Sequence, residues 1–64
     1  MAIHAKKNGL MIAGKIISET DSAWKFQAID NKKPTIVMKD DDKNHVFDGD
    51  DAVELAMKWM DVTW

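Results

Sequence analysis

The stretch FDGDDAVELAMKWMDVTW, residues 47–64, decides the fold. It opens with acidic residues, whose carboxylates can accept hydrogen bonds from the free N–H groups of a helix start and interact favourably with the helix dipole. Asp51 and Glu54 have the three-residue spacing of a capping box, and Gly49 supplies a turn before them. The stretch therefore predicts a C-terminal helix over residues 50–61.

This helix is apolar around most of its circumference. Its polar residues fall on one stripe, Glu54, Lys58 and Asp61, whereas a helix that lies on a sheet needs an apolar stripe of only about 100°. The surplus must be covered by the ends of the chain, residues 1–10 and 62–64, or by another molecule. Trp and Met are enriched in protein interfaces. We therefore expect a protein interface formed by Leu55, Met57, Trp59, Met60 and Trp64.

Upstream of the helix, the sequence indicates short strands joined by turns of hairpin length. Alternating and β-branched residues predict strands at residues 10–18, 24–29, 35–39 and 45–47. Residues 1–8 are mixed, and we expect either a flexible arm or an edge strand there. Hairpin connections give an antiparallel meander. The predicted fold is α+β in a single domain, residues 1–64: a meander sheet of three to four strands with one C-terminal helix packed on one face, in the order β-β-β-β-α.

Three residues within the strands carry further information. Trp24 and Phe26 alternate onto one face, which would most naturally meet the helix, and their size predicts that they belong to the core. Gly14 interrupts the first of these strands, which indicates a bulge or a close neighbour.

The composition indicates a soluble protein of the cytoplasm. The 64 residues include no cysteine, which excludes disulfides and thiolate metal sites, and the start of the chain lacks the long apolar core of a secretory signal. No segment approaches the roughly twenty apolar residues of a membrane span, so we expect no membrane partner. A single core is only marginally sufficient at this length, which favours oligomerisation.

Charge is distributed unevenly along the chain. Residues 1–39 carry seven lysines against three acidic residues, a balance of +4, and residues 40–64 carry two lysines against eight acidic residues, a balance of −6. The chain has no arginine, the residue best suited to bidentate recognition of phosphate and guanine, which disfavours sequence-specific DNA reading. An acidic rim or a patch for a basic partner is expected from Asp40, Asp41, Asp42, Asp48, Asp50 and Asp51.

The acidic run also invites interpretation as a calcium site. Positions 1, 3, 5, 9 and 12 of an EF-hand loop would be filled by Asp40, Asp42, Asn44, Asp48 and Asp51. Position 6, however, is His45 where the loop needs glycine, and position 12 is not the bidentate Glu. We therefore expect a solvated turn followed by a helix, with no metal ion and no cofactor.

No residue pattern assembles a catalytic site. His4 lies in the mixed N-terminal segment, and His45 is next to the acidic turn. Ser18 and Ser22 flank a hairpin, where serine is expected for turn formation. A base and a nucleophile must be held together by rigid surroundings, and the sequence marks no such pair. We therefore expect that the protein is not an enzyme.

Lysines near an aromatic residue suggest an alternative function, the binding of single-stranded nucleic acid. Lys25, Lys32 and Lys33 could hold phosphates, and Trp24 could stack a base if it were exposed on the sheet.

Residues 24–61 resemble the three-stranded sheet-plus-helix DNA-binding modules of the AP2 and integrase arm-binding type. The likeness rests on WKFQAID, residues 24–30, followed by HVFDGDDAVELAMKWMD, residues 45–61. It implies a helix packed on a three-stranded sheet. Those modules use arginine and other basic residues on the sheet, whereas this sheet has only lysine.

The apolar surplus on the helix favours a small non-enzymatic protein-interaction module. It would act as a homodimer, or as an inhibitor or adaptor that binds a host protein. Compact acidic proteins of this size are common among phage-encoded factors that bind and block host proteins, and a phage or another mobile element is one source that we consider for this chain.

Overall fold

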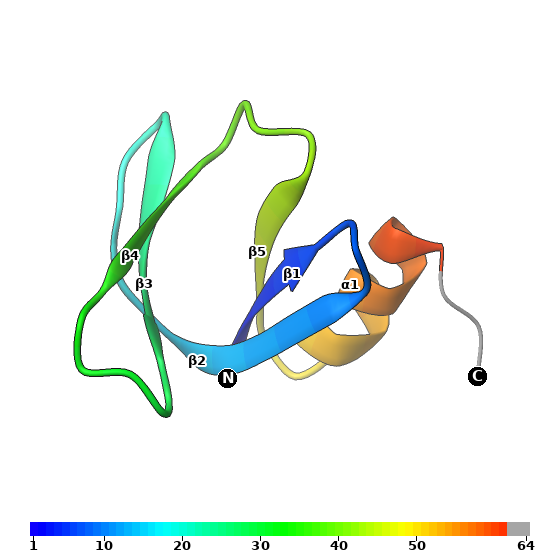
Figure 1. The fold of residues 1–64 in the computed structure, drawn as a ribbon, viewed down its shortest axis with the longest axis horizontal. Coiled ribbons are helices and arrows are strands. Elements are labelled where there is room, and N and C mark those ends of the chain that lie inside the picture. Colours follow the sequence, from blue (N-terminus) through cyan, green and yellow to red (C-terminus); the bar gives the residue numbers. More distant parts are fainter. Residues whose placement is uncertain (62–64) are drawn as a thin grey trace.

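The computed structural model describes residues 1–61 and has an α+β fold, a curled antiparallel sheet with one C-terminal helix (Figure 1). The elements in chain order are β1 (Ala2–Lys6), β2 (Leu10–Glu19), β3 (Ala23–Ala28), β4 (Thr35–Met38), β5 (Asn44–Asp48) and α1 (Ala52–Met60). The predicted fold class is confirmed, with five strands in place of three to four. Within the described residues, no helix is long and apolar enough to cross a membrane.

The sheet curls because tight turns connect its two edges. The strand order is β4-β3-β2-β1-β5, so β1 to β4 form a meander. The predicted meander consisted of β2 to β5, and its last strand is a correction: β5 pairs with β1 and not with β4. Strands lie about 4.8 Å apart, which would put the edges of a flat five-stranded sheet about 19 Å apart. The connection from β4 to β5 folds back on itself, since the Asp41 N–H donates to the Met38 carbonyl. The edges must therefore approach each other, and the sheet becomes a partly closed barrel (Figure 1).

β1 is an inner strand, which corrects the prediction for residues 1–8. It pairs with β2 on one side and with β5 on the other, so it is neither an arm nor an edge. Asn8 and Gly9 form the turn into β2, with Gly9 at φ 96° and its N–H bonded to the Lys6 carbonyl. Asn-Gly is a strong hairpin signal, so the sequence did contain the information for a strand before it.

Two apolar cores lie on opposite faces of the curled sheet. The interior core is enclosed by the sheet itself, and its buried apolar residues are Ala2, Trp24, Phe26, Val37 and Val46. The outer core lies between the sheet and α1, and its buried residues are Ile3, Ala5, Ala52, Ala56 and Met60. Alternating residues of β1 contribute to both cores, because successive side chains of a strand point to opposite faces.

Trp24 and Phe26 are buried, but they do not face the helix as predicted. Both belong to the interior core, whereas α1 contacts chiefly β1 and β5. The curl encloses the aromatic face without help from the helix, which is why the prediction is wrong. For the same reason, the fold differs from a three-stranded sheet backed by a helix: two of the five strands that build it, β1 and β2, precede residue 24.

The ends of α1 differ in part from the prediction. Asp51 is the N-cap residue, but its side chain makes no capping hydrogen bond, so the capping box with Glu54 is not formed. Gly49 makes the expected turn, at φ 113°. At the other end Asp61 adopts the left-handed conformation, φ 58°, and its N–H donates to the Lys58 carbonyl.

Gly14 has the close neighbour that the sequence predicts. A Cβ atom at this position would lie 2.1 Å from the carbonyl oxygen of Gln27 and 2.7 Å from Cζ of Phe26. The bulge in β2 lies further along the strand, between Ile16 and Ser18. The missing side chain of Gly14 thus allows β3 and the Phe26 ring to pack directly on β2.

Candidate interaction surface

One part of the predicted helix interface is used inside the protein. Met60 is buried together with Ala52 and Ala56, and these residues form the stripe of α1 that packs in the outer core. Trp59 is half-buried beside them, with its ring 5.9 Å from the Phe47 ring. This burial removes Met60 from the interface prediction and assigns most of the Trp59 contact area to the fold.

The other part of the predicted helix interface stays at the surface. Leu55 is 37% exposed, and Val53 is exposed to the same extent. Met57 is half-buried, and Trp64 lies outside the described residues. The apolar helix surface that the sheet leaves uncovered is therefore smaller than the helical pattern predicts.

Trp59 is held between a lysine and an aromatic cluster. Nζ of Lys7 lies 4.1 Å from the centre of the Trp59 ring and donates to the Trp59 carbonyl, so a cation meets the negative end of the helix dipole. His45 contacts the rings of Trp24 at 4.7 Å and Phe47 at 4.5 Å. Burial lowers the pKa of His45, and the charge of Lys39 lowers it further. The cluster connects the interior and outer cores.

The fold divides the predicted acidic patch into two groups. One group lies in the turn between β4 and β5, and the other lies at the end of β5 and in the turn before α1. All six aspartates are exposed: Asp40, Asp41, Asp42, Asp48, Asp50 and Asp51. Because β5 is extended, about 20 Å of strand separates Asp42 from Asp48. The six carboxylates therefore form two separate groups and not one continuous patch.

The extended conformation of β5 also contradicts the interpretation of the acidic run as a calcium site. An EF-hand loop wraps its ligands around one ion, whereas Asn44–Asp48 is extended and paired with β1. In residues 1–61, no group of three or more His, Asp and Glu side chains is placed to hold a metal ion.

His4 and Asp41 belong to a hydrogen-bond network that ties β1 to the β4–β5 turn. Nε2 of His4 lies 3.0 Å from Oδ1 of Asn44, and Nδ2 of Asn44 donates to Oδ2 of Asp41 at 3.0 Å. The backbone N–H of Lys43 donates to the other Asp41 oxygen and is the main cause of the lowered Asp41 pKa. Burial lowers the pKa of His4, although the bond to Asn44 acts in the opposite direction.

The alternative nucleic-acid site is split by the alternation of β3. Trp24 is 8% exposed and belongs to the interior core. Lys25 is exposed on the opposite face, and Lys32 and Lys33 are exposed in the turn that follows. Neighbouring side chains of a strand point to opposite faces, so Trp24 is not available to stack a base beside these lysines.

A surface that the sequence analysis did not identify lies on the outer face of β2, β3 and β4. Ile36 is 59% exposed, and Ile17 and Met38 are also exposed. Strand pairing places Ile36 opposite Lys25, and the bulge containing Ile17 opposes the same lysine from β2. We call Ile17, Ile36 and Met38 the sheet patch. The sequence feature that indicates this patch is the alternation in TIVM, residues 35–38, where Val37 is buried and its neighbours Ile36 and Met38 are exposed.

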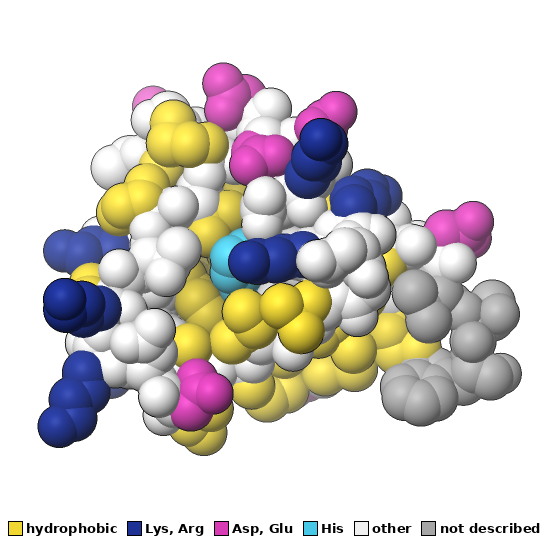
Figure 2. All heavy atoms as spheres, in the orientation of Figure 1, with side chains coloured by type: hydrophobic (Ala, Val, Ile, Leu, Met, Phe, Trp, Pro, Cys, Tyr) yellow, Lys and Arg dark blue, Asp and Glu magenta, His cyan; other side chains and the backbone are white. Residues whose placement is uncertain are grey.

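The charges around the sheet patch differ from those elsewhere on the molecule. Figure 2 shows lysines along the edge of the molecule formed by β3 and β4, interspersed with hydrophobic side chains, whereas acidic side chains gather near the β4–β5 turn. The uneven charge of the two chain segments is thus also uneven in space.

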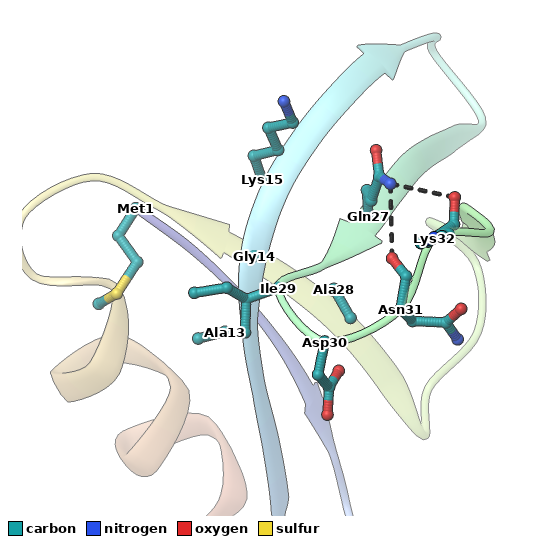
Figure 3. A pocket seen from close by; sticks show the side chains of 10 residues that line it. All are labelled: Met1, Ala13, Gly14, Lys15, Gln27, Ala28, Ile29, Asp30, Asn31 and Lys32. Atoms are coloured by element: carbon teal, nitrogen blue, oxygen red, sulfur yellow. Dashed lines mark hydrogen bonds between the residues drawn. The ribbon is translucent and has the colours of Figure 1, made fainter.

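A shallow pocket of about 600 Å³ adjoins the sheet patch (Figure 3). Its apolar lining includes Ala13 and Gly14 of β2 and Ile29, which is 84% exposed. Lys15 and Gln27, which pair across β2 and β3, lie on its polar side. This pair precedes the pairing of Ser18 with Lys25 along β2 and β3, so the pocket and the sheet patch lie next to each other.

The loop at the edge of the pocket is held by side-chain hydrogen bonds. Nε2 of Gln27 donates to the carbonyl oxygens of Asn31 and Lys32, at 3.4 and 3.1 Å (Figure 3). Oδ1 of Asn31 accepts from the Lys33 N–H at 3.0 Å. The lysine-bearing turn therefore has a defined position relative to the pocket.

Comparison of the chain with protein-family models, with curated proteins and with solved structures finds no match.

Proposed function

We propose that the protein is a non-enzymatic protein-interaction module and that it binds its partner through the sheet patch. The observation that supports this most directly is the exposure of three large aliphatic side chains, one on β2 and two on β4. They lie on a part of the sheet away from α1. Exposed apolar residues that gather on one face with polar surroundings are typical of protein contact sites. Full burial of one such side chain contributes about 1.5–3 kcal/mol.

The contacts of the two histidines favour a binding role over catalysis. His4 is buried in the interior core beside Phe26 and Asn44, and His45 packs among aromatic rings. Both side chains stabilise the fold in these positions. A catalytic base has to reach a substrate proton directly or through one water.

Capture of partners by wild type and two surface variants tests this proposal. Ile36→Lys places a charge in the sheet patch, and Leu55→Lys places the same charge on the exposed flank of α1. We expect Ile36→Lys to lose a protein that wild type captures from cells of its source, and Leu55→Lys to retain it. Both variants should keep the far-UV circular dichroism of wild type, because both positions are exposed. Retention of the captured protein by Ile36→Lys would contradict the proposal. Loss of the captured protein with Leu55→Lys alone would indicate that the interface lies on the helix.

The partner is either a second copy of the chain or a host protein, and sedimentation distinguishes the two. A homodimer through the sheet patch dissociates on dilution through the low micromolar range, and Ile36→Lys shifts the equilibrium to monomer. A chain that binds a host protein as an inhibitor or adaptor remains monomeric in both forms.

Single-stranded nucleic-acid binding is a second candidate, favoured by the exposed lysines Lys25, Lys32 and Lys33. Without Trp24, such binding would depend mainly on phosphate contacts and would weaken steeply with salt. Fluorescence anisotropy of a labelled single-stranded oligonucleotide at low salt tests it. Binding that Lys32→Glu abolishes would support this candidate, and no change in anisotropy would exclude it.

A further inference from the structure

We propose that the pocket beside the sheet patch receives an apolar anchor side chain from an acidic segment of the partner protein. The inference rests on the proposed function and names the chemistry of the partner. It depends on three features of the site: an apolar lining built from small residues, a loop held in place, and lysines around both the pocket and the patch.

The pocket has room for an anchor side chain because part of its lining is made of small residues. Ala13 and Ala28 in the lining have only a methyl group as side chain. Met1 and Ile29 stand on the apolar side, both strongly exposed (Figure 3). The volume of about 600 Å³ lies in the usual range of binding pockets. An aliphatic or aromatic side chain placed there would cover apolar surface that water now contacts.

The loop that closes one side needs little ordering when a partner binds. The side chain of Gln27 donates to two carbonyl groups of this loop, and the Ile29 N–H donates to the Ala13 carbonyl. Preorganised sites lose less conformational entropy on binding. The backbone position of Lys32 is therefore set before the partner arrives.

Charge complementarity selects an acidic segment. Lys15 and Lys32 line the pocket, against the single carboxylate of Asp30. Lys25 lies between Ile17 and Ile36 of the neighbouring sheet patch, and Lys33 follows Lys32 in the same loop. Carboxylates that flank an apolar anchor would meet these cations, which increases the association rate and excludes basic partners.

Nuclear magnetic resonance titration of the full chain with short peptides tests the inference. The probe is the acetylated, amidated peptide Asp-Glu-Leu-Glu-Asp. We expect amide shifts in residues 13–15 and 27–32. Two matched peptides, Lys-Lys-Leu-Lys-Lys and Asp-Glu-Ser-Glu-Asp, lack the charge or the anchor and should leave these amides unchanged. Equal shifts with all three peptides, or shifts confined to other residues, would overturn the inference.

Two charge reversals and a fatty acid complete the test. Lys15→Glu should lower the affinity for the acidic peptide roughly tenfold. Lys43→Glu, in the β4–β5 turn, should change this affinity by less than about twofold. Decanoate carries the same apolar and anionic chemistry in a small molecule, and binding of decanoate without binding of the peptide would overturn the assignment to a protein segment. If Ile36→Lys abolishes partner capture while Lys15→Glu changes neither capture nor peptide shifts, this inference fails and the proposed function stands.

Discussion

Gly14 shows how one missing side chain controls the approach of two strands. A Cβ atom there would overlap the Gln27 carbonyl oxygen, a backbone atom that cannot move aside without breaking the β2–β3 pairing. We predict that Gly14→Ala lowers the free energy of unfolding by about 2–4 kcal/mol. Urea denaturation followed by tryptophan fluorescence measures this change. Ser18→Ala, an exposed position of the same strand, is the control and should change stability by less than about 0.5 kcal/mol. Equal stability of Gly14→Ala and wild type would show that the strands can separate at no cost.

The lowered pKa values of the two histidines predict that acid destabilises the protein. Burial lowers the pKa of both His4 and His45 from the ordinary value of 6.5. Each side chain then binds a proton more readily in the unfolded chain, so stability is full above about pH 6.5 and decreases as the pH falls below it. Urea midpoints between about pH 7.5 and 5 measure this dependence.

A substitution at His45 separates the contribution of one histidine from that of other groups. His45→Phe keeps a ring among Trp24, Phe47 and Trp59 but cannot take up a proton. We expect a weaker decrease of the urea midpoint with acid than in wild type. An unchanged pH dependence in this variant would assign the effect entirely to His4 or to other groups.

At the scale of elements, the C-terminal end of α1 is a place where a substitution can increase the stability of the protein. Asp61 adopts the left-handed conformation, which glycine accepts most readily, and it places a negative charge at the negative end of the helix dipole. We predict that Asp61→Gly raises the free energy of unfolding by about 0.5–1 kcal/mol. Thermal unfolding followed by circular dichroism measures the gain. Asp61→Asn, which removes only the charge, should give a smaller gain, and a loss of stability with Asp61→Gly would show that the carboxylate has a stabilising contact.

The strand β1 is the element that contributes to the whole molecule. It pairs on both sides and contributes alternate side chains to both cores. A flexible arm could be removed with little effect, whereas an inner strand could not. We predict that deletion of residues 1–7 abolishes folding, seen as loss of chemical-shift dispersion in the nuclear magnetic resonance spectrum. A folded deletion variant would show that β2 and β5 can close the sheet without β1.

At the scale of the whole molecule, curling of the sheet decides which residues are free for function. The closed interior buries Trp24 and excludes it from nucleic-acid stacking, and the outer core buries Met60. The same curl turns Ile36 and Met38 outward, beyond the reach of α1. The candidate interface therefore moved from the helix, where residue type suggested it, to the sheet.

The sequence by itself determined the local structure of most of the chain. Periodicity and turn residues located the last four strands and the helix close to their observed bounds, because these signals depend on neighbours along the chain. They also identified Gly14 as a position of close approach and Trp24 and Phe26 as core residues. Asn8-Gly9 carried an equally local signal for β1.

Only the tertiary structure decided which face each residue occupies and which strands are partners. The pairing of β1 with β5 joins residues about forty positions apart, and no local pattern encodes it. That pairing makes β5 an edge of the sheet, and the short β4–β5 connection then draws the two edges together and curls the sheet. The curled sheet has two cores instead of one and exposes the sheet patch beside its pocket. The physical reason is that alternation assigns side chains to two faces, while only long-range pairing decides whether each face is enclosed, covered by the helix or left in water.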